Sequence, residues 1–262
     1  MAPERDSKGQ RIAKLLARAG VGSRRDVERW IAEGRVAVGG RALTTPAFTL
    51  ASLDGVTVDG KPVATPEPAR LWRYHKPRGL VVSHRDERDR PTVFASLPAG
   101  LPRVVSVGRL DIASEGLLLL TNDGALARRL ELPATGWVRR YRARVFGVPD
   151  PATLAALAKG VTVAGLAYGP IEARLDRRQG DNAWLTIGLR EGRNREVRRV
   201  LEHLGLKVNR LIRTSYGPFQ LGQLGVGEVA PVPRKVLRDQ LGAAFDTATE
   251  ERPRRAHRRR SP

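Results

Sequence analysis

Residues 105–124 read V-S-V-G-R-L-D-I-A-S-E-G-L-L-L-L-T-N-D-G, and the fold is decided by how this stretch is built. A β-branched run leads into Gly108-Arg109-Leu110-Asp111, and an apolar run follows at 116–120. We therefore expect Asp111 to lie in a tight connection between buried strands, close to Arg109. An aspartate after a strand is more often a turn or capping residue than a catalytic one, so the bare pattern assigns no function.

Composition restricts the partners and the chemistry of the chain. Its 262 residues include 47 Lys and Arg against 27 Asp and Glu, a formal net charge of +20. Only seven of the basic residues are lysines, and the arginine fork binds phosphate and stacks on bases, so we expect a polyanionic partner. GC-rich codon usage also enriches arginine, but it does not by itself create this charge excess. With no cysteine and four histidines, the expected chemistry uses carboxylates, arginines and hydroxyls, with no metal and no other cofactor.

The sequence gives no sign of a membrane span or a secretory signal. The densest apolar stretch, 117–120, is far shorter than the about 20 residues that a membrane span requires. The first ten residues mix charges of both signs with no apolar segment behind them. We therefore expect a cytoplasmic protein with no membrane partner.

A small N-terminal domain is expected over residues 11–61, after a flexible segment of ten residues. Apolar residues recur at helical spacing over 12–19, and Ser23 with Asp26 forms a capping-box pattern at the start of a second helix. Gly39-Gly40 follows an alternating run and predicts a hairpin turn. The pattern indicates a helix-helix-hairpin domain.

A larger domain is expected over residues 71–242, after a proline-rich linker at 62–70. Short β-like runs alternate with helical stretches along this region. The β-like runs are 104–107, 141–145, 171–175 and 184–189, and the helical stretches are 125–130, 151–157 and 195–204. This order favours a mixed, mainly antiparallel α+β fold. The last segment, 243–262, is a like-charged basic tail that we expect to be disordered and to add nonspecific RNA affinity.

The N-terminal unit resembles the S4-type RNA-binding domain, named after a small-subunit ribosomal protein. The resemblance rests on R-I-A-K-L-L-A-R-A-G-V-G-S-R-R-D-V-E-R-W-I-A-E-G-R-V-A-V-G-G at residues 11–40, where Gly39 replaces the usual Asn of the turn. An ordinary helical hairpin with a solvated basic face is the alternative interpretation. The resemblance implies that the RNA-facing residues are Lys14, Arg18, Ser23, Arg24, Arg25 and Arg35.

The larger domain resembles the pseudouridine synthases that modify bacterial ribosomal RNA. Residues 108–124 are similar to the signature of this family, which implies that Asp111 is the catalytic carboxylate. Residues 74–79, Y-H-K-P-R-G, resemble its lysine-proline-x-glycine loop, although His75 stands where Asn is usual.

Two further motifs follow in the order that the family shows. R-R-Y-R-A-R-V places Tyr141 where the family carries a base-stacking tyrosine. E-G-R-N-R-E-V-R-R-V-L-E-H-L-G, residues 191–205, resembles the motif whose arginine, here Arg198, pairs with the catalytic aspartate. The resemblance also implies RNA contacts for a further set of basic residues, Arg109, Lys76, Arg193, Arg195 and Arg199.

The same residues can be interpreted without the family. In the helix after Asn194, Arg198 lies on the border of the apolar stripe, so its fork can hold a carboxylate bidentately and keep it ionised, while Arg199 points outward. Alternation along 141–145 turns Tyr141 inward, either as an ordinary core tyrosine or as a stacking platform for an extruded base. A solvated basic helix face remains the alternative for the arginines of 195–199.

These observations predict an RNA pseudouridine synthase, an isomerase that acts as a monomer on a uridine of ribosomal RNA or of a pre-ribosomal particle. The resemblance is closer to enzymes of the large subunit (23S) RNA than of the small subunit (16S) RNA. Asp111 is expected as nucleophile or base, Arg198 as its partner and Tyr141 as the stacking residue. The alternatives are a noncatalytic RNA-binding assembly factor, or a hydrolase that uses Asp111 and Glu115 as acid and base. The second alternative is disfavoured because Glu115 is expected in a solvent-facing turn before Gly116.

Overall fold

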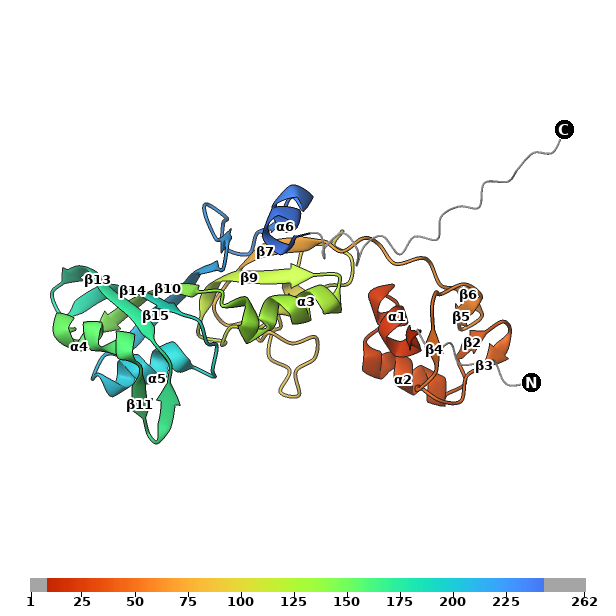
Figure 1. The fold of residues 1–262 in the computed structure, drawn as a ribbon, viewed down its shortest axis with the longest axis horizontal. Coiled ribbons are helices and arrows are strands. Elements are labelled where there is room, and N and C mark those ends of the chain that lie inside the picture. The colour runs from red at the N-terminus through yellow and green to blue at the C-terminus, as the bar shows by residue number, and fades with distance from the viewer. Residues whose placement is uncertain (1–8, 243–262) are drawn as a thin grey trace.

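The computed structural model describes residues 9–242, which form two domains joined by an extended segment (Figure 1). The predictions for the first eight residues and for the basic tail lie outside the described residues. Gln10 does not belong to a flexible segment, because it pairs with Leu50 in a short ladder. No helix within residues 9–242 is both long and apolar enough to cross a bilayer.

The N-terminal domain is the predicted pair of helices with short strands. Its elements are β1 (Gln10–Arg11), α1 (Ile12–Arg18), α2 (Arg24–Ala32), β2 (Val36–Val38), β3 (Arg41–Ala42), β4 (Thr49–Leu50), β5 (Val56–Val58) and β6 (Lys61–Pro62). The capping box at the start of α2 is present, since Ser23 Oγ accepts from the Asp26 amide and the Asp26 carboxylate accepts from the Ser23 amide. Gly39 and Gly40 both adopt positive φ between β2 and β3, as a two-residue hairpin turn requires.

The larger domain is built on one mixed sheet. Its strands are β7 (Leu71–Lys76), β8 (Val105–Val107), β9 (Glu115–Thr121), β10 (Arg139–Phe146), β11 (Val161–Val163), β12 (Leu166–Tyr168), β13 (Ile171–Gln179), β14 (Asn182–Leu189), β15 (Lys207–Tyr216), β16 (Phe219–Gln220) and β17 (Val229–Pro231). Its helices are α3 (Gly124–Glu131), α4 (Pro151–Ala156), α5 (Glu196–His203) and α6 (Arg234–Leu241). The predicted α+β class is confirmed.

The sheet has two antiparallel halves that meet at one parallel contact. The strand order is β13-β14-β10-β15-β9-β7-β17, with β16 on β15 and β8 on β9, and β11 pairs with β12 separately. Only two residue pairs join β15 to β9, Ile212 with Glu115 and Arg213 with Gly116. The loop that contains Asp111 connects β8 to β9 at this junction.

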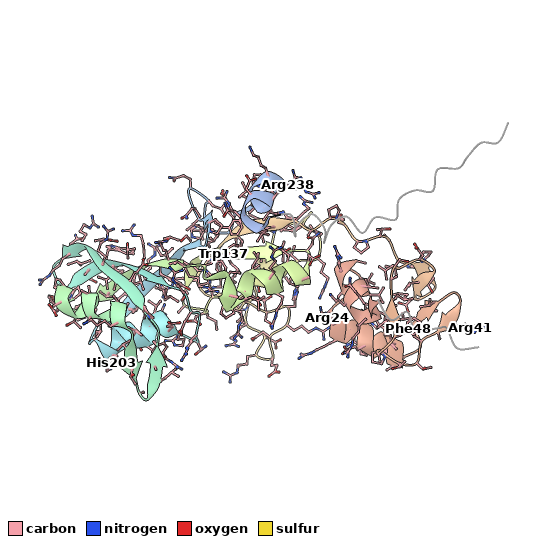
Figure 2. All side chains as sticks on the ribbon, in the orientation of Figure 1. Arg24, Arg41, Phe48, Trp137, His203 and Arg238 are labelled. Atoms are coloured by element: carbon pink, nitrogen blue, oxygen red, sulfur yellow. The ribbon has the colours of Figure 1, made fainter. Side chains whose placement is uncertain are left out.

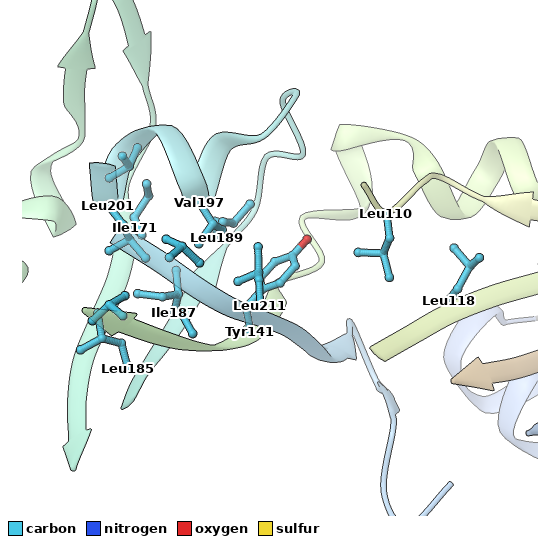
Figure 3. Close-up of a cluster of buried hydrophobic side chains, with 14 of the residues drawn as sticks. Leu110, Leu118, Tyr141, Ile171, Leu185, Ile187, Leu189, Val197, Leu201 and Leu211 are labelled. Atoms are coloured by element: carbon cyan, nitrogen blue, oxygen red, sulfur yellow. The ribbon is translucent and has the colours of Figure 1, made fainter. Parts of the chain in front are cut away.

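Helices cover opposite faces of the two halves. In the β7 and β9 half, Leu117 and Leu119 pack with α3 and α6. In the other half, Tyr141, Ala143 and Val145 pack with α4 and α5 on the opposite face (Figure 3). The face that carries Tyr141 also carries the loops that precede β9. A cleft lies on this face between these loops and the start of α5.

Candidate active site

A cleft of about 680 Å³ lies at the junction of the two sheet halves. One wall is the loop 108–114, and the other is the segment 192–197 at the start of α5. Its floor includes Tyr141 of β10 and Leu211 of β15. A volume of this size falls within the range of small-ligand pockets, so the cleft can hold a nucleotide.

Asp111 is a half-buried residue of the cleft wall, in the connection where the sequence predicted it. Its own carbonyl accepts from the Ser114 amide at 3.0 Å, which closes a turn. Gly79 donates its amide to the Ile112 carbonyl at 2.8 Å, so the loop that follows β7 holds this turn from outside. Asp111 is therefore a carboxylate carried by a braced turn at the edge of a cavity.

Lys76 braces the same turn from below, and the prediction that it contacts RNA is wrong. Its side chain is fully buried. The ammonium donates to the carbonyl oxygens of Pro77 at 2.9 Å, Asp111 at 3.3 Å and Ser114 at 2.9 Å. Burial lowers the pKa of Lys76 to about 8, against the opposing attraction of the Asp111 and Glu115 carboxylates. A single buried cation thus holds both ends of the Asp111 turn.

Arg198 also holds this turn, but it does not pair directly with the Asp111 carboxylate. It is buried, and its guanidinium donates to the carbonyl oxygens of Ala113 at 3.0 Å and Val208 at 3.1 Å. No salt bridge within 4.0 Å joins Arg198 to Asp111, so the predicted bidentate pair is corrected. Burial lowers the pKa of Arg198, and the charge of Asp111 acts in the opposite direction. The Asp111 charge therefore acts on Arg198 although the two side chains form no direct ion pair.

Tyr141 faces inward, as the alternation along β10 predicted. It is buried at the end of the apolar cluster, and Figure 3 shows its hydroxyl directed toward the side that carries Leu110. Its ring also lines the cleft. Tyr141 is therefore a core residue whose ring also lines the cavity, and its role as a stacking platform for a base stays a prediction.

Three cleft residues were missed from the sequence, and they contact one another. Two guanidiniums lie over the Tyr216 ring, with the Arg139 Cζ 4.7 Å and the Arg213 Cζ 5.3 Å from its centroid. Arg139 donates to the Tyr216 hydroxyl at 2.8 Å, which in turn donates to the Leu130 carbonyl at 3.1 Å. Arg139 lies two residues before Tyr141, so the same alternation along the strand points to it.

The remaining arginines of the larger domain divide between the cleft and the surface. Arg109, Arg193 and Arg195 are exposed and line the cleft, whereas Arg199 is exposed outside it. Arg193 is paired with Glu191 at 2.7 Å. Arg195 has a left-handed backbone, with φ of 54°, directly before α5. Cations therefore border the cleft, as expected for a site that receives a phosphate-linked nucleotide.

In the N-terminal domain, the structure leaves some of the predicted RNA-facing residues open and gives others partners. Arg24 and Arg25 are exposed, and Lys14 is half-exposed. Figure 2 shows Arg24 on the side of this domain that faces the larger one. These three side chains remain candidates for RNA contact.

The other three predicted residues already have partners. The Ser23 hydroxyl caps α2. Arg35 holds the Asp59 carboxylate bidentately, with both contacts at 2.7 Å, and also contacts Glu33. Arg18 lies 3.0 Å from Asp123 of the larger domain. These partners give Ser23, Arg35 and Arg18 a structural role in this conformation, and their contact with RNA stays a prediction.

Glu115 is not in a solvent-facing turn, which corrects the reason given against the hydrolase. It is the first residue of β9, is buried, and pairs with Arg210 at 2.5 Å. Glu115 is absent from the cleft lining, while Asp111 belongs to it. A carboxylate pair for hydrolysis needs both groups at the same cavity, so this arrangement still disfavours the hydrolase.

Comparisons with known proteins agree with the geometry of a nucleotide site joined to an RNA-binding domain. Residues 70–203 match the family described as RNA pseudouridylate synthase, and residues 10–54 match the S4 domain. A protein of Rickettsia bellii described as an uncharacterized RNA pseudouridine synthase is 47% identical over 87% of this chain and 99% of its own length. The ribosomal large subunit pseudouridine synthase B of Pasteurella multocida is 43% identical over 81% of this chain and 64% of its own length.

A solved structure shows the same architecture. The crystal structure of a pseudouridylate synthase matches with a TM-score of 0.61 and 25% identity, and it covers 88% of this chain and 99% of that chain. The fold and the cleft thus define an RNA-modifying isomerase with an appended RNA-binding domain. The chain belongs to the RNA pseudouridylate synthase family, and its N-terminal domain is an S4 domain.

Proposed function

We propose that this protein converts one specific uridine of 23S ribosomal RNA to pseudouridine, in the cytoplasm and as a monomer. The observation that carries the proposal is the position of Asp111, a carboxylate on a braced turn at the wall of a cleft that can hold a nucleotide. The large-subunit target is supported by the 43% identity to the ribosomal large subunit synthase of Pasteurella multocida.

The reaction needs a bond to break and a bond to form on the same nucleotide. The bond from uracil N1 to ribose C1′ breaks, the base turns, and C5 bonds to C1′. C5 loses a proton and N1 gains one, so composition is unchanged. We assign to Asp111 the role of nucleophile or base in this exchange. No external group and no redox partner is required.

The other cleft residues hold the substrate and the Asp111 turn in place. We assign to Tyr141 stacking against the extruded uracil, because its ring forms part of the cavity floor. Arg198 holds the Ala113 carbonyl and thereby fixes the turn that carries Asp111. Arg109, Arg193 and Arg195 bind the phosphates that flank the target.

The proposal is tested by mapping pseudouridine chemically in 23S and 16S RNA from cells with the wild-type gene, without the gene, or with Asp111→Asn. Asparagine keeps the shape and removes the charge, so one site should be lost without the gene and restored by the wild type alone. We expect the rate with Asp111→Asn to fall by at least about 10⁴-fold, since the group that reacts is lost.

A matched control separates lost chemistry from lost structure. Asp239→Asn alters an exposed aspartate of α6 that does not line the cleft, so it should leave the modification unchanged. The purified Asp111→Asn protein should bind the RNA within about threefold of the wild type. Persistence of the site with Asp111→Asn would refute the role of Asp111, and a lost site in 16S RNA would refute the large-subunit target.

A further inference from the structure

The sheet of the larger domain has one face that the helices leave open. In the half formed by β13, β14, β10 and β15, α4 and α5 pack on the face that carries Tyr141. On the opposite face, α3 and α6 cover only the region around Leu117 and Leu119. Alternate residues of β10, from Arg140 to Phe146, are exposed there. In Figure 1 this half forms the end of the molecule farthest from the S4 domain.

Side chains cross this outer face in registered rows. The pairing aligns Arg177, Trp184, Arg144 and Arg210 in one row, with one residue on each of β13, β14, β10 and β15. The pairing aligns Gln179, Asn182, Phe146 and Lys207 in the next row in the same way. Neighbouring residues across strands lie about 5 Å apart, so the first row spans about 15 Å. We call these two rows the outer patch.

The acidic residues of this face lie mainly outside the outer patch. Glu172 is 3.6 Å from Arg140. Asp176 is 3.2 Å from Arg174 and 3.9 Å from Arg142. These pairs occupy the rows closer to the junction of the sheet halves, so the charge there is largely compensated.

Within the outer patch the positive charge is in excess. Arg210 is paired with Glu115. Arg144, Arg177 and Lys207 are exposed, and across the part of the chain that the structure describes no carboxylate lies within 4.0 Å of them. Three unpaired cations on one small surface favour an anionic partner.

Aromatic rings stand among these cations. Phe146 is 50% exposed, although a large apolar side chain gains by burial. Trp184 is half-buried, and the Arg142 guanidinium lies 4.7 Å from its ring centroid. An exposed ring beside unpaired cations forms the kind of surface that binds single-stranded nucleic acid, because bases stack on the ring while phosphates contact the cations.

We propose that the outer patch binds a second, single-stranded segment of the ribosomal RNA whose target uridine enters the cleft. This inference rests on the proposed function, because it assumes that ribosomal RNA is the substrate. The outer patch and Tyr141 lie on opposite faces of β10, so an RNA that reaches both must pass around the edge of the sheet. A short hairpin that fills the cleft does not reach the outer patch.

The test compares two doubly substituted proteins with the same change of charge. The patch variant is Arg144→Glu with Lys207→Glu, and the control is Arg234→Glu with Lys235→Glu, two exposed residues of α6. Binding is measured with a 23S RNA transcript over a range of salt concentrations. We expect the patch variant to lose at least tenfold more affinity than the control, and its salt slope to fall by about two, one for each phosphate contact.

Turnover of a short hairpin that contains the target uridine should stay within twofold of the wild type. Arg144→Gln with Lys207→Gln removes the charges without adding acids and should give a smaller loss of the same kind. Equal losses in patch and control variants, or an equal loss on the short hairpin, would overturn the proposal. Unchanged affinity for naked RNA with weaker binding to ribosomal proteins would also overturn it, since the partner would then be a protein.

Failure of the proposed function can be distinguished from failure of this inference. A wild-type protein that makes no pseudouridine would refute the enzyme assignment, while the binding comparison would still measure the outer patch. A wild-type protein that modifies RNA, with patch and control variants that bind alike, would refute the outer patch alone.

Discussion

At the residue scale, Lys76 is the least expected component of the site, because a fully buried ammonium has a large cost of desolvation. Three carbonyl oxygens that belong to the Asp111 turn and its neighbour Pro77 offset part of this cost. The pKa of Lys76 is nevertheless lowered from 10.5 to about 8. Titration of Lys76 therefore makes the free energy of unfolding depend on pH.

The sign of that dependence follows from proton binding. Below about pH 8 Lys76 is protonated in both the folded and the unfolded chain. Between about 8 and 10.5 the unfolded chain binds more protons, so stability rises with pH. We predict that the free energy of unfolding of the wild type, relative to Lys76→Met, rises by about 3 kcal/mol across this range. Denaturant titrations at several pH values measure it, and a constant difference would show that Lys76 is not held in this way.

A substitution of Arg198 tests whether the two hydrogen bonds of its guanidinium position the turn that carries Asp111. Arg198→Lys keeps the charge but cannot reach both the Ala113 and the Val208 carbonyl oxygens with one planar fork. We predict that kcat falls about tenfold to a hundredfold while KM changes less than about threefold, because the substrate still binds. Arg199→Lys, on the exposed side of the same helix, is the control and should behave as the wild type. A rise in KM alone would instead indicate that Arg198 contacts the RNA.

At the element scale, the junction between β9 and β15 depends on a single glycine. Gly116 has φ of +104°, and an added Cβ would lie 2.7 Å from the backbone nitrogen of Arg213. Gly116→Ala should therefore cost at least about 3 kcal/mol of unfolding free energy, from backbone strain and a clash that β15 cannot relieve. Gly227→Ala has a positive φ in open space and should cost about 1 kcal/mol. Equal losses in denaturant titrations would show that the two strands are not packed this closely.

Many of the helices and strands could be predicted from the sequence, whereas β15 and the pairing of distant strands could not. The two S4 helices and the Asp111 turn follow local rules of capping, periodicity and turn formation. β15 was missed because its inward positions include Arg213, a buried cation that breaks the apolar alternation. The apolar run 116–120 was expected as a buried strand after Asp111, and it lies in β9, where every residue is buried. Residue pairing between distant strands carries no local signal at all.

The sequence predicted which residues lie at the candidate site, but it did not predict which atoms the buried basic side chains contact. Asp111 and Tyr141 line the cleft as expected. Lys76 was expected to contact RNA and Arg198 to pair with the Asp111 carboxylate, yet both bind backbone carbonyls of the loop that carries Asp111. The sequence does not show whether a basic side chain contacts a phosphate, a carboxylate or a backbone carbonyl. Only burial separates these cases, and burial is a property of the fold.

At the scale of the whole molecule, the S4 domain is attached to the larger domain by more than the chain. The Arg18 Nε lies 3.0 Å from the Asp123 carboxylate, whose other oxygen accepts from the Ala125 and Leu126 amides at the start of α3. The bridge thus connects α1 directly to the beginning of α3. We expect this bridge to set the orientation of the exposed arginines of α2 relative to the cleft.

We predict that Arg18→Gln releases this orientation with little loss of stability. Asp123 keeps its two amide donors at the start of α3, so loss of this largely buried pair should cost no more than about 2 kcal/mol of unfolding free energy. X-ray scattering in solution should show a broader distribution of distances between the domains, and KM for the 23S transcript should rise severalfold while kcat stays constant. Arg29→Gln, which breaks pairs only within α2 and with Glu33, is the control. If the scattering is unchanged while KM rises, Arg18 contacts the RNA itself, and the domain orientation is set by the linker instead.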